Sequence, residues 1–154
     1  MSQRYEYAVS LRIRHPSMRP GLITRTLGLT PKIKKTAGAA RRTPRGALLR
    51  SADGTLLGGV NPWSYWVADI LRHGVGRVGR RSSEEQHVER LCKKLVRHAQ
   101  FFKRIHHDGG QVEIWVSSHS SRNYTFELTP GRLQSLASAG VALVIDVYPY
   151  PQNW

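Results

Sequence analysis

The sequence has few of the features that indicate a disulfide bond, a membrane span or a secretion signal. It contains 1 cysteine in 154 residues, Cys92, which excludes an intramolecular disulfide and is typical of a reducing compartment. The longest apolar run covers residues 141–145, far short of the roughly 20 residues that span a bilayer. The opening segment, MSQRYEYAVSLRIRH, lacks the apolar stretch of a signal peptide. We therefore expect a cytoplasmic protein with no membrane partner.

Groups of catalytic or metal-binding side chains are also scarce. No pair of carboxylates offers itself for acid–base catalysis. Cys92 lies on the apolar stripe of a predicted helix, where a free cysteine acts as a small hydrophobe. The adjacent residues His106, His107 and Asp108 do not share a helix face, which argues against a common metal ion. We therefore expect no enzyme activity, no metal site and no cofactor.

Asp146 is the exception among the carboxylates. It lies in an otherwise apolar segment, where an unpaired carboxylate would be costly to bury. Buried charges are usually paired, so the favoured interpretation is a salt bridge to Arg12 or Arg14. The alternative is that Asp146 lines a cleft.

Negative charge is scarce, and positive charge is concentrated in one part of the chain. The sequence has 24 Lys and Arg against 10 Asp and Glu, a formal net charge of +14. Residues 1–50 hold 12 basic side chains and 1 acidic one, whereas residues 111–154 hold 2 and 3. Charge distributed in this way indicates a local surface for an anionic partner rather than general solubility.

Apolar patterning predicts a single domain that mixes strands and helices. Strand patterns occupy residues 5–14, 61–70, 112–116 and 141–148. Helix patterns occupy residues 19–27, 83–106 and 127–140, with Gly28 as a C-terminal cap of the first helix. Strands and helices do not alternate strictly, so we predict an α+β sandwich. Its sheet would be mainly antiparallel or mixed, with about five strands, one long helix and two short helices.

One strand and two connecting segments complete the predicted organisation of residues 1–154. Residues 141–148 are apolar on both faces, which is typical of a strand at the centre of a sheet. Residues 36–60 are rich in Gly and basic residues, and we expect a long loop or a loose hairpin there. Residues 73–82 are rich in Gly and Arg, and we expect a flexible connector. Its GVGRVG stretch imitates a phosphate loop but lacks the strand, turn and Lys-Ser/Thr context.

The order of several blocks resembles a known family. The blocks are YAVSLRIRHPSMRPGLITRTLGLTP, the basic RRTPRG, then LLGGVNPWSYW, a long helix and a final LASAGVALVIDVY. In this order the chain resembles a bacterial family of small proteins described only as a domain of unknown function (four-two-seven-nine). The resemblance implies no established activity, and some members are similar in context to immunity proteins, which neutralise toxins. The stretch ALLRSADGT is an extension relative to the family pattern.

The candidate binding residues combine cations with nearby aromatics. Tyr, Trp and Arg dominate the energetics of protein interfaces, and basic residues beside aromatics also bind nucleic acids. The candidates are Lys32, Lys34, Lys35, Arg41, Arg42, Arg45, Arg50, Trp63, Tyr65 and Trp66. We expect a non-catalytic protein-binding module of immunity type that docks an acidic partner, such as a toxin, through the basic loop. The alternative is an RNA, DNA or phosphate binder that uses the same loop; an enzyme is the least favoured class. The sequence does not predict an oligomeric state.

Overall fold

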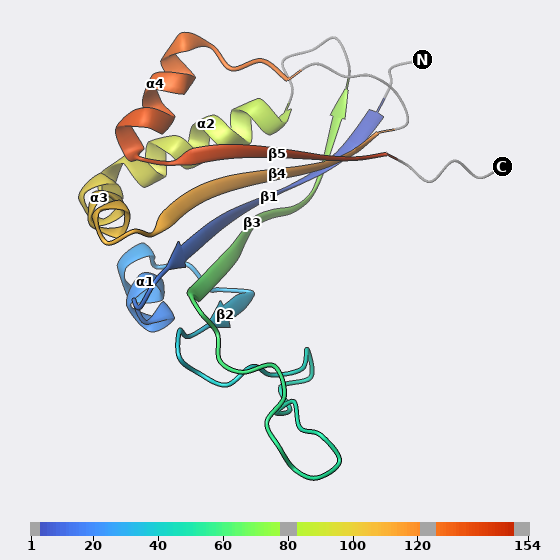
Figure 1. Cartoon of the computed structure of the whole chain (residues 1–154). Coiled ribbons are helices and arrows are strands. Elements are labelled where there is room, and N and C mark those ends of the chain that lie inside the picture. Colours follow the sequence, from blue (N-terminus) through green and yellow to red (C-terminus); the bar gives the residue numbers. More distant parts are fainter. Residues whose placement is uncertain (1–3, 78–82, 121–125, 150–154) are drawn as a thin grey trace, which may run out of the picture.

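Five strands form one mixed sheet in a computed structural model that describes residues 4–77, 83–120 and 126–149. The order in the sheet is β2-β3-β1-β4-β5 (Figure 1). The strands are β1 (Arg4–His15), β2 (Ile33–Lys35), β3 (Ser64–Arg77), β4 (Gln111–Ser120) and β5 (Ala142–Pro149). All neighbouring pairs are antiparallel except β4 and β5, which run parallel. The predicted α+β class and mixed sheet are confirmed.

The helices cover one face of this sheet. They are α1 (Pro20–Leu27), α2 (Ser83–Leu95), the 3-10 turn η1 (Val96–His98), α3 (Ala99–His107) and α4 (Pro130–Ala139). Figure 1 shows α2 and α4 above the sheet, α3 at the end of the sheet where β4 begins, and α1 beside the end of β1. The single long helix predicted from the sequence is therefore two α-helices joined by a 3-10 turn. The tighter turn shifts the phase of the apolar stripe, so that both Phe101 and Phe102 are buried.

The core lies between the sheet and these helices. Period-two alternation along β1 places Tyr7, Val9, Leu11 and Ile13 in the core, each at most 2% exposed. The intervening side chains of β1, including Arg12, lie on the opposite face of the sheet, which is called the open face here. The strand predicted at residues 5–14 is confirmed, and its position between β3 and β4 makes it the centre of the sheet.

Two predictions of local structure need correction, and one strand was not predicted. β5 is at the edge of the sheet rather than at its centre, because β4 is its one neighbour within the described residues. β3 continues to Arg77, so residues 73–77 belong to a strand that pairs with β1 rather than to a flexible connector. Residues 78–82 of the predicted connector lie outside the described residues. The short strand β2 was not predicted, because three residues are too few to show a period.

Candidate functional site

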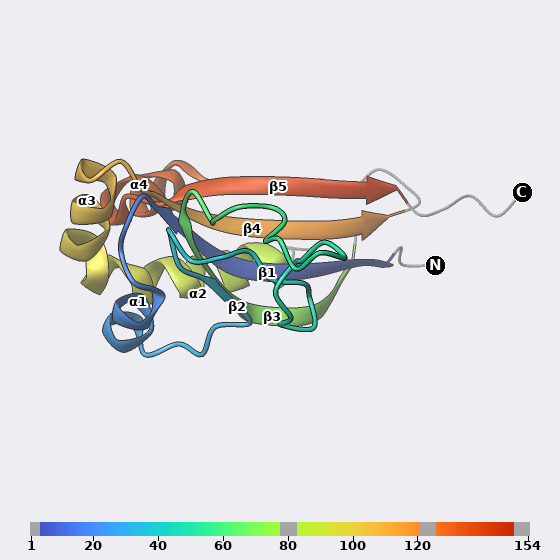
Figure 2. The same ribbon diagram turned by 60° about the horizontal axis from the view of Figure 1, so that its bottom comes forward.

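A long arm connects β2 to β3 and extends from the body of the protein. This arm comprises residues 36–63 and lies on the side of the sheet opposite to α2 and α4 (Figures 1 and 2). Three isolated bridges order it, between Ala40 and Val60, Arg42 and Leu48, and Arg50 and Leu56. Both descriptions offered for residues 36–60, a loop or a loose hairpin, thus apply in part. The segment has no regular strands, yet its backbone is paired.

Two compact turns inside the arm are closed by arginine side chains. The Nη1 group of Arg42 donates to the carbonyl of Gly46 at 2.8 Å, and that of Arg50 donates to the carbonyl of Gly54 at 2.7 Å. Gly46 and Gly54 have φ angles of 84° and 85°, a left-handed conformation that favours glycine. The sequence pattern Arg-x-x-x-Gly therefore appears twice with the same geometry. Each arginine keeps its charge exposed while it orders its own turn.

A third interaction strengthens the second turn. The Oγ of Ser51 donates to Oδ1 of Asp53, and the backbone N–H of Thr55 donates to the same oxygen at 3.1 Å. These bonds, that from Ser51 first, lower the pKa of Asp53 below its ordinary value because they stabilise the carboxylate. The acidic residue of the arm is thus engaged in the arm's own structure.

The predicted cations lie on the surface, and one of them is neutralised. Nζ of Lys32 lies 3.3 Å from Oδ2 of Asp69, so this lysine is held by the protein's own carboxylate. The other six are exposed and form no ion pair within the described residues; they are Lys34, Lys35, Arg41, Arg42, Arg45 and Arg50. Most of the predicted cationic surface therefore faces solvent.

Apolar side chains accompany these cations on the arm. Leu49, Leu56, Leu57 and Val60 are 37%, 49%, 48% and 55% exposed. Each is among the large hydrophobic side chains that the described structure leaves exposed, whereas those of β1 are buried. A cluster of exposed apolar residues among charged ones is typical of a surface that contacts another molecule. Sequence reasoning missed these residues because it considered only the charge of the loop.

The three predicted aromatic residues have three different environments. Trp63 is 38% exposed at the base of the arm, with Cζ of Arg14 5.0 Å from the centre of its ring. Tyr65 is half-buried on the open face of β3. Trp66 is 0% exposed, and its Nε1 donates to Oγ1 of Thr24 at 3.0 Å. Trp66 is therefore a core residue and must be removed from the candidate binding set.

The open face carries a polar network that the sequence analysis did not identify as a site. Cζ of Arg12 lies 3.8 Å from the centre of the Trp115 ring, a cation–π contact, and its Nε donates to Ser10. Nε1 of Trp115 donates to Oε2 of Glu113 at 2.8 Å. The alternation in β4 placed Trp115 away from the core, so the strand pattern contained this signal. Arg12, Trp115 and Glu113 are thus engaged with neighbouring side chains of the open face.

Asp146 belongs to the same face but not to the predicted salt bridge. Its Oδ2 accepts a hydrogen bond of 2.6 Å from the hydroxyl of Tyr148, and it forms no ion pair within the described residues. The bond and the charge of Asp146 raise the pKa of Tyr148. The reason is the edge position of β5, where solvent reaches Asp146 and removes the need for a cationic partner.

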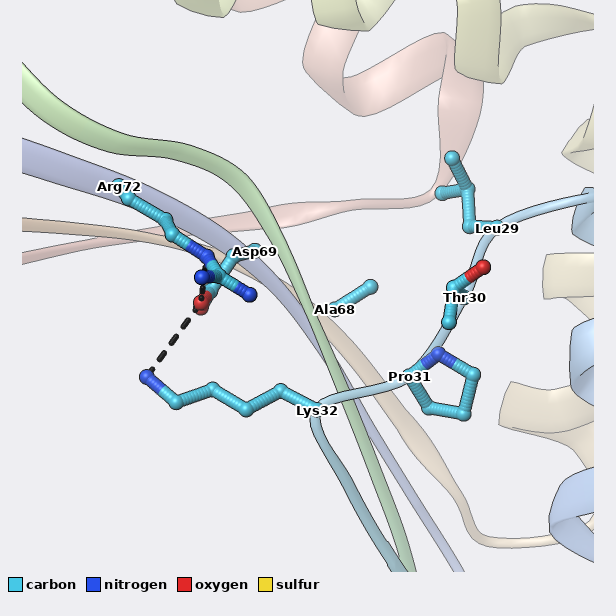
Figure 3. A pocket seen from close by; sticks show the side chains of 7 residues that line it. All are labelled: Leu29, Thr30, Pro31, Lys32, Ala68, Asp69 and Arg72. Carbon is cyan, nitrogen blue, oxygen red and sulfur yellow. Dashed lines mark ion pairs between the residues drawn. The ribbon is translucent and has the colours of Figure 1, made fainter.

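A small hollow of about 260 Å³ lies where the chain enters β2 (Figure 3). Its lining residues are Leu29, Thr30, Pro31, Lys32, Ala68, Asp69 and Arg72. Oδ2 of Asp69 lies 3.3 Å from Nζ of Lys32 and 3.3 Å from Nε of Arg72, so one carboxylate is shared by two cations. The hollow therefore has an excess of positive charge but no second group positioned for chemistry.

Cys92 and His15 carry groups that could act in catalysis or metal binding, but the contacts of each are those of a residue that supports the fold. Cys92 is 2% exposed, and burial raises the pKa of its thiol to about 11, which makes it a poor nucleophile. Nδ1 of His15 accepts the backbone N–H groups of Ser17 and Met18 at 3.0 and 2.8 Å. His15 thus has a strand-end role as the last residue of β1. The described residues contain no group of three or more metal-binding side chains.

Comparison with known families gives the class of the protein. The family model "Domain of unknown function (DUF4279)" matches residues 5–150, and the chain therefore belongs to this family. The resemblance stated from the sequence is confirmed at the level of the family. Neither the comparison with curated proteins nor that with solved structures gave a match. None of the helices in the described ranges is long and apolar enough to cross a membrane.

Proposed function

We propose that this protein is a non-catalytic binding module of immunity type, whose arm docks an acidic protein partner. The observation that carries the proposal is the composition of the arm's surface. Exposed leucine and valine side chains occur there together with exposed arginines that form no ion pair within the described residues. Protein interfaces combine an apolar centre with charges that select the partner, and arginine is enriched among their strongest contacts.

The order within the arm supports binding. Its bridges and arginine-closed turns fix the backbone before a partner arrives. A preorganised surface loses less conformational entropy on association, so more of the contact energy contributes to affinity. An arm that merely linked β2 to β3 would not need this order, since a shorter turn suffices to join antiparallel neighbours.

The apolar residues favour a protein over a nucleic acid. Nucleic-acid interfaces are more polar and rely on exposed aromatics for stacking on bases. Within the arm, Trp63 is the aromatic residue, and the guanidinium of Arg14 already lies near its ring. Leu56 and Leu57 would add little to phosphate binding but would contribute strongly to a protein contact.

The immunity-type role rests on the family resemblance. Because immunity proteins neutralise toxins, the first candidate partner to test is the protein encoded by the adjacent gene. The product of the gene adjacent to this one is purified, and its affinity for the full chain is measured by calorimetry. The variant Arg41→Ala/Arg42→Ala/Arg45→Ala is expected to bind about 10- to 100-fold more weakly, because arginines at an interface often contribute more than 1 kcal/mol each. Its melting temperature should change little, since each exposed substitution lies within about 0.5 kcal/mol and the bond from Arg42 to Gly46 orders only its own turn of the arm.

A matched control separates the arm from the overall charge. The variant Arg25→Ala/Arg90→Ala/Arg97→Ala removes the same charge from exposed positions of the body. It should bind like the unmodified protein. Equal weakening by both variants would show that overall charge, and not the arm, determines binding. The absence of binding, together with salt-sensitive binding of a single-stranded RNA or a duplex DNA oligonucleotide, would replace the protein-binding proposal by the nucleic-acid alternative.

A further inference from the structure

The outer edge of β5 is open in the described structure. β5 has 8 residues, pairs with β4 along one side and ends the order of the sheet. The backbone N–H and C=O groups along its outer side can bind water or a further strand. Long, apolar edge strands are prone to pair with other chains, and proteins usually protect them.

The opposite edge of the same sheet is protected in part by β2, which pairs with Tyr65, Trp66 and Val67 of β3. β2 is only 3 residues long, and two of them, Lys34 and Lys35, are exposed lysines. Short edge strands and lysine side chains both oppose edge-to-edge pairing. β5 is longer and carries one charged residue, Asp146, which is hydrogen-bonded to Tyr148. β2 thus opposes pairing where it lies, and the adjoining part of β3 carries the charged residues Asp69 and Arg72, whereas β5 has no comparable protection within the described residues.

The side chains of β5 are apolar on both faces, as is typical of a strand with neighbours on both sides. Ile145 and Val147, on the same face as the buried β4 residues Val116 and Ser118, are 44% and 54% exposed. Leu133 of α4, the helix that precedes β5, is 51% exposed. Residues 141–148 are apolar on both faces, a pattern expected of strands with neighbours on both sides. A further strand along the edge would cover these side chains and supply the missing neighbour.

Charge identifies the strand that fits. The whole chain has a net charge of +14, whereas residues 111–154 contain 2 basic and 3 acidic side chains. Two copies with this net charge repel one another, and residues 111–154, which carry none of the positive excess, are where they approach at the lowest electrostatic cost. We propose that β5 pairs antiparallel with β5 of a second copy, so that the two five-stranded sheets form one continuous sheet.

Two-fold symmetry restricts the register of this pair. Directly opposite residues lie on the same face of a sheet, so the axis must pass beside a residue that faces its own copy. A centre at Ile145 sets Leu143 opposite Val147 of the partner subunit, an apolar pair. It also sets Val144 opposite Asp146 of the partner subunit. A centre at Asp146 would oppose two carboxylates and is disfavoured.

Analytical ultracentrifugation of the full chain across the micromolar range tests the dimer. The unmodified protein should reach twice the 17.4 kDa of one chain. Ile145→Lys/Val147→Lys should raise the dissociation constant about tenfold or more, because lysines oppose edge pairing. Leu56→Lys in the arm removes a side chain of similar exposure and should leave the dimer intact. An unmodified protein that stays monomeric, or equal dissociation by both variants, would overturn the proposal.

Disulfide trapping tests the register without disturbing the fold. Ile145→Cys should form a disulfide-linked dimer under mild oxidation, because each new thiol faces its copy. Val147→Cys, its matched control, should not, because it faces Leu143 of the partner subunit. The native Cys92 can be kept, since it is buried with a raised pKa. A dimer that crosslinks through residue 147 and not through residue 145 would refute the arrangement.

Discussion

The body and the arm of this protein use apolar side chains in opposite ways. In the body, Phe102 and Trp66 are 0% exposed and join the sheet to the helices. In the arm, Leu56 and Val60 are 49% and 55% exposed, and the backbone is ordered by turns and bridges instead. Burial thus stabilises the body, while local hydrogen bonds shape the arm. The difference supports the proposal that the arm's apolar surface contacts another molecule.

The largest expected effect comes from a pair of truncations that contrasts the two regions. Phe102→Ala should lower the free energy of unfolding by about 3–5 kcal/mol, because it leaves a cavity between α3 and the sheet. Leu56→Ala in the arm should change it by less than about 0.5 kcal/mol. Urea denaturation followed by circular dichroism measures both. A similar loss in the two variants would show that the arm is part of the folded core.

A smaller effect is expected at the contact that joins α1 to β3. Trp66→Phe keeps most of the buried ring but removes the donor to Oγ1 of Thr24, at a cost of about 1 kcal/mol. Thr24→Val removes the acceptor. In a double-mutant cycle the two changes should not add, because they remove the same bond. Fully additive free energies would show that this hydrogen bond contributes no coupling. No substitution in the arm should affect this cycle.

The smallest expected effect is on the loss of stability at acidic pH, and it also distinguishes the body from the arm. In the body, the hydrogen bond from Lys93 and then that from Arg132 hold the pKa of Glu89 below its ordinary value. A carboxylate with a lowered pKa in the folded state stabilises it above its unfolded pKa. That stabilisation is lost as the pH falls through the folded pKa.

Glu89→Gln should therefore reduce the loss of melting temperature between neutral and acidic pH, by a small amount because the site is exposed. Asp53 of the arm also has a lowered pKa, with Ser51 as the main cause. Asp53→Asn is the matched variant, and it should leave the global acid dependence unchanged while it loosens the second turn of the arm. Thermal scans at both pH values measure this comparison. A greater effect of Asp53→Asn than of Glu89→Gln would contradict it.

Local periodicity predicted the elements of the body but not their neighbours. β1, α1, β4 and α4 follow from apolar spacing and glycine caps, because those signals act within a few residues. The place of β5 did not follow, since strand order depends on contacts between distant segments. The same limit applies to β3, whose glycines at positions 74 and 76 suggested a loop although β1 pairs with that segment.

The candidate site was predictable in its charge but not in its complete composition. The run of cations was visible in the sequence, and six of its seven members are exposed without an ion pair in the described ranges. Lys32 differs because β3 brings Asp69 beside it, a contact between distant segments. Trp66 is buried although its neighbour Tyr65 lies on the open face, because adjacent residues of a strand point to opposite faces of the sheet. The apolar residues of the arm had no periodicity to reveal them.

The central position of β1 has a consequence for synthesis on the ribosome. β1 is made before β3 and β4, yet it forms hydrogen bonds with both. A nascent chain that ends before residue 111 can join β1 to β3 but leaves the other side of β1 unoccupied. During translation this strand must therefore wait for a segment about a hundred residues downstream, a long contact order that slows folding. Chaperones that bind extended apolar segments would find their target in this interval.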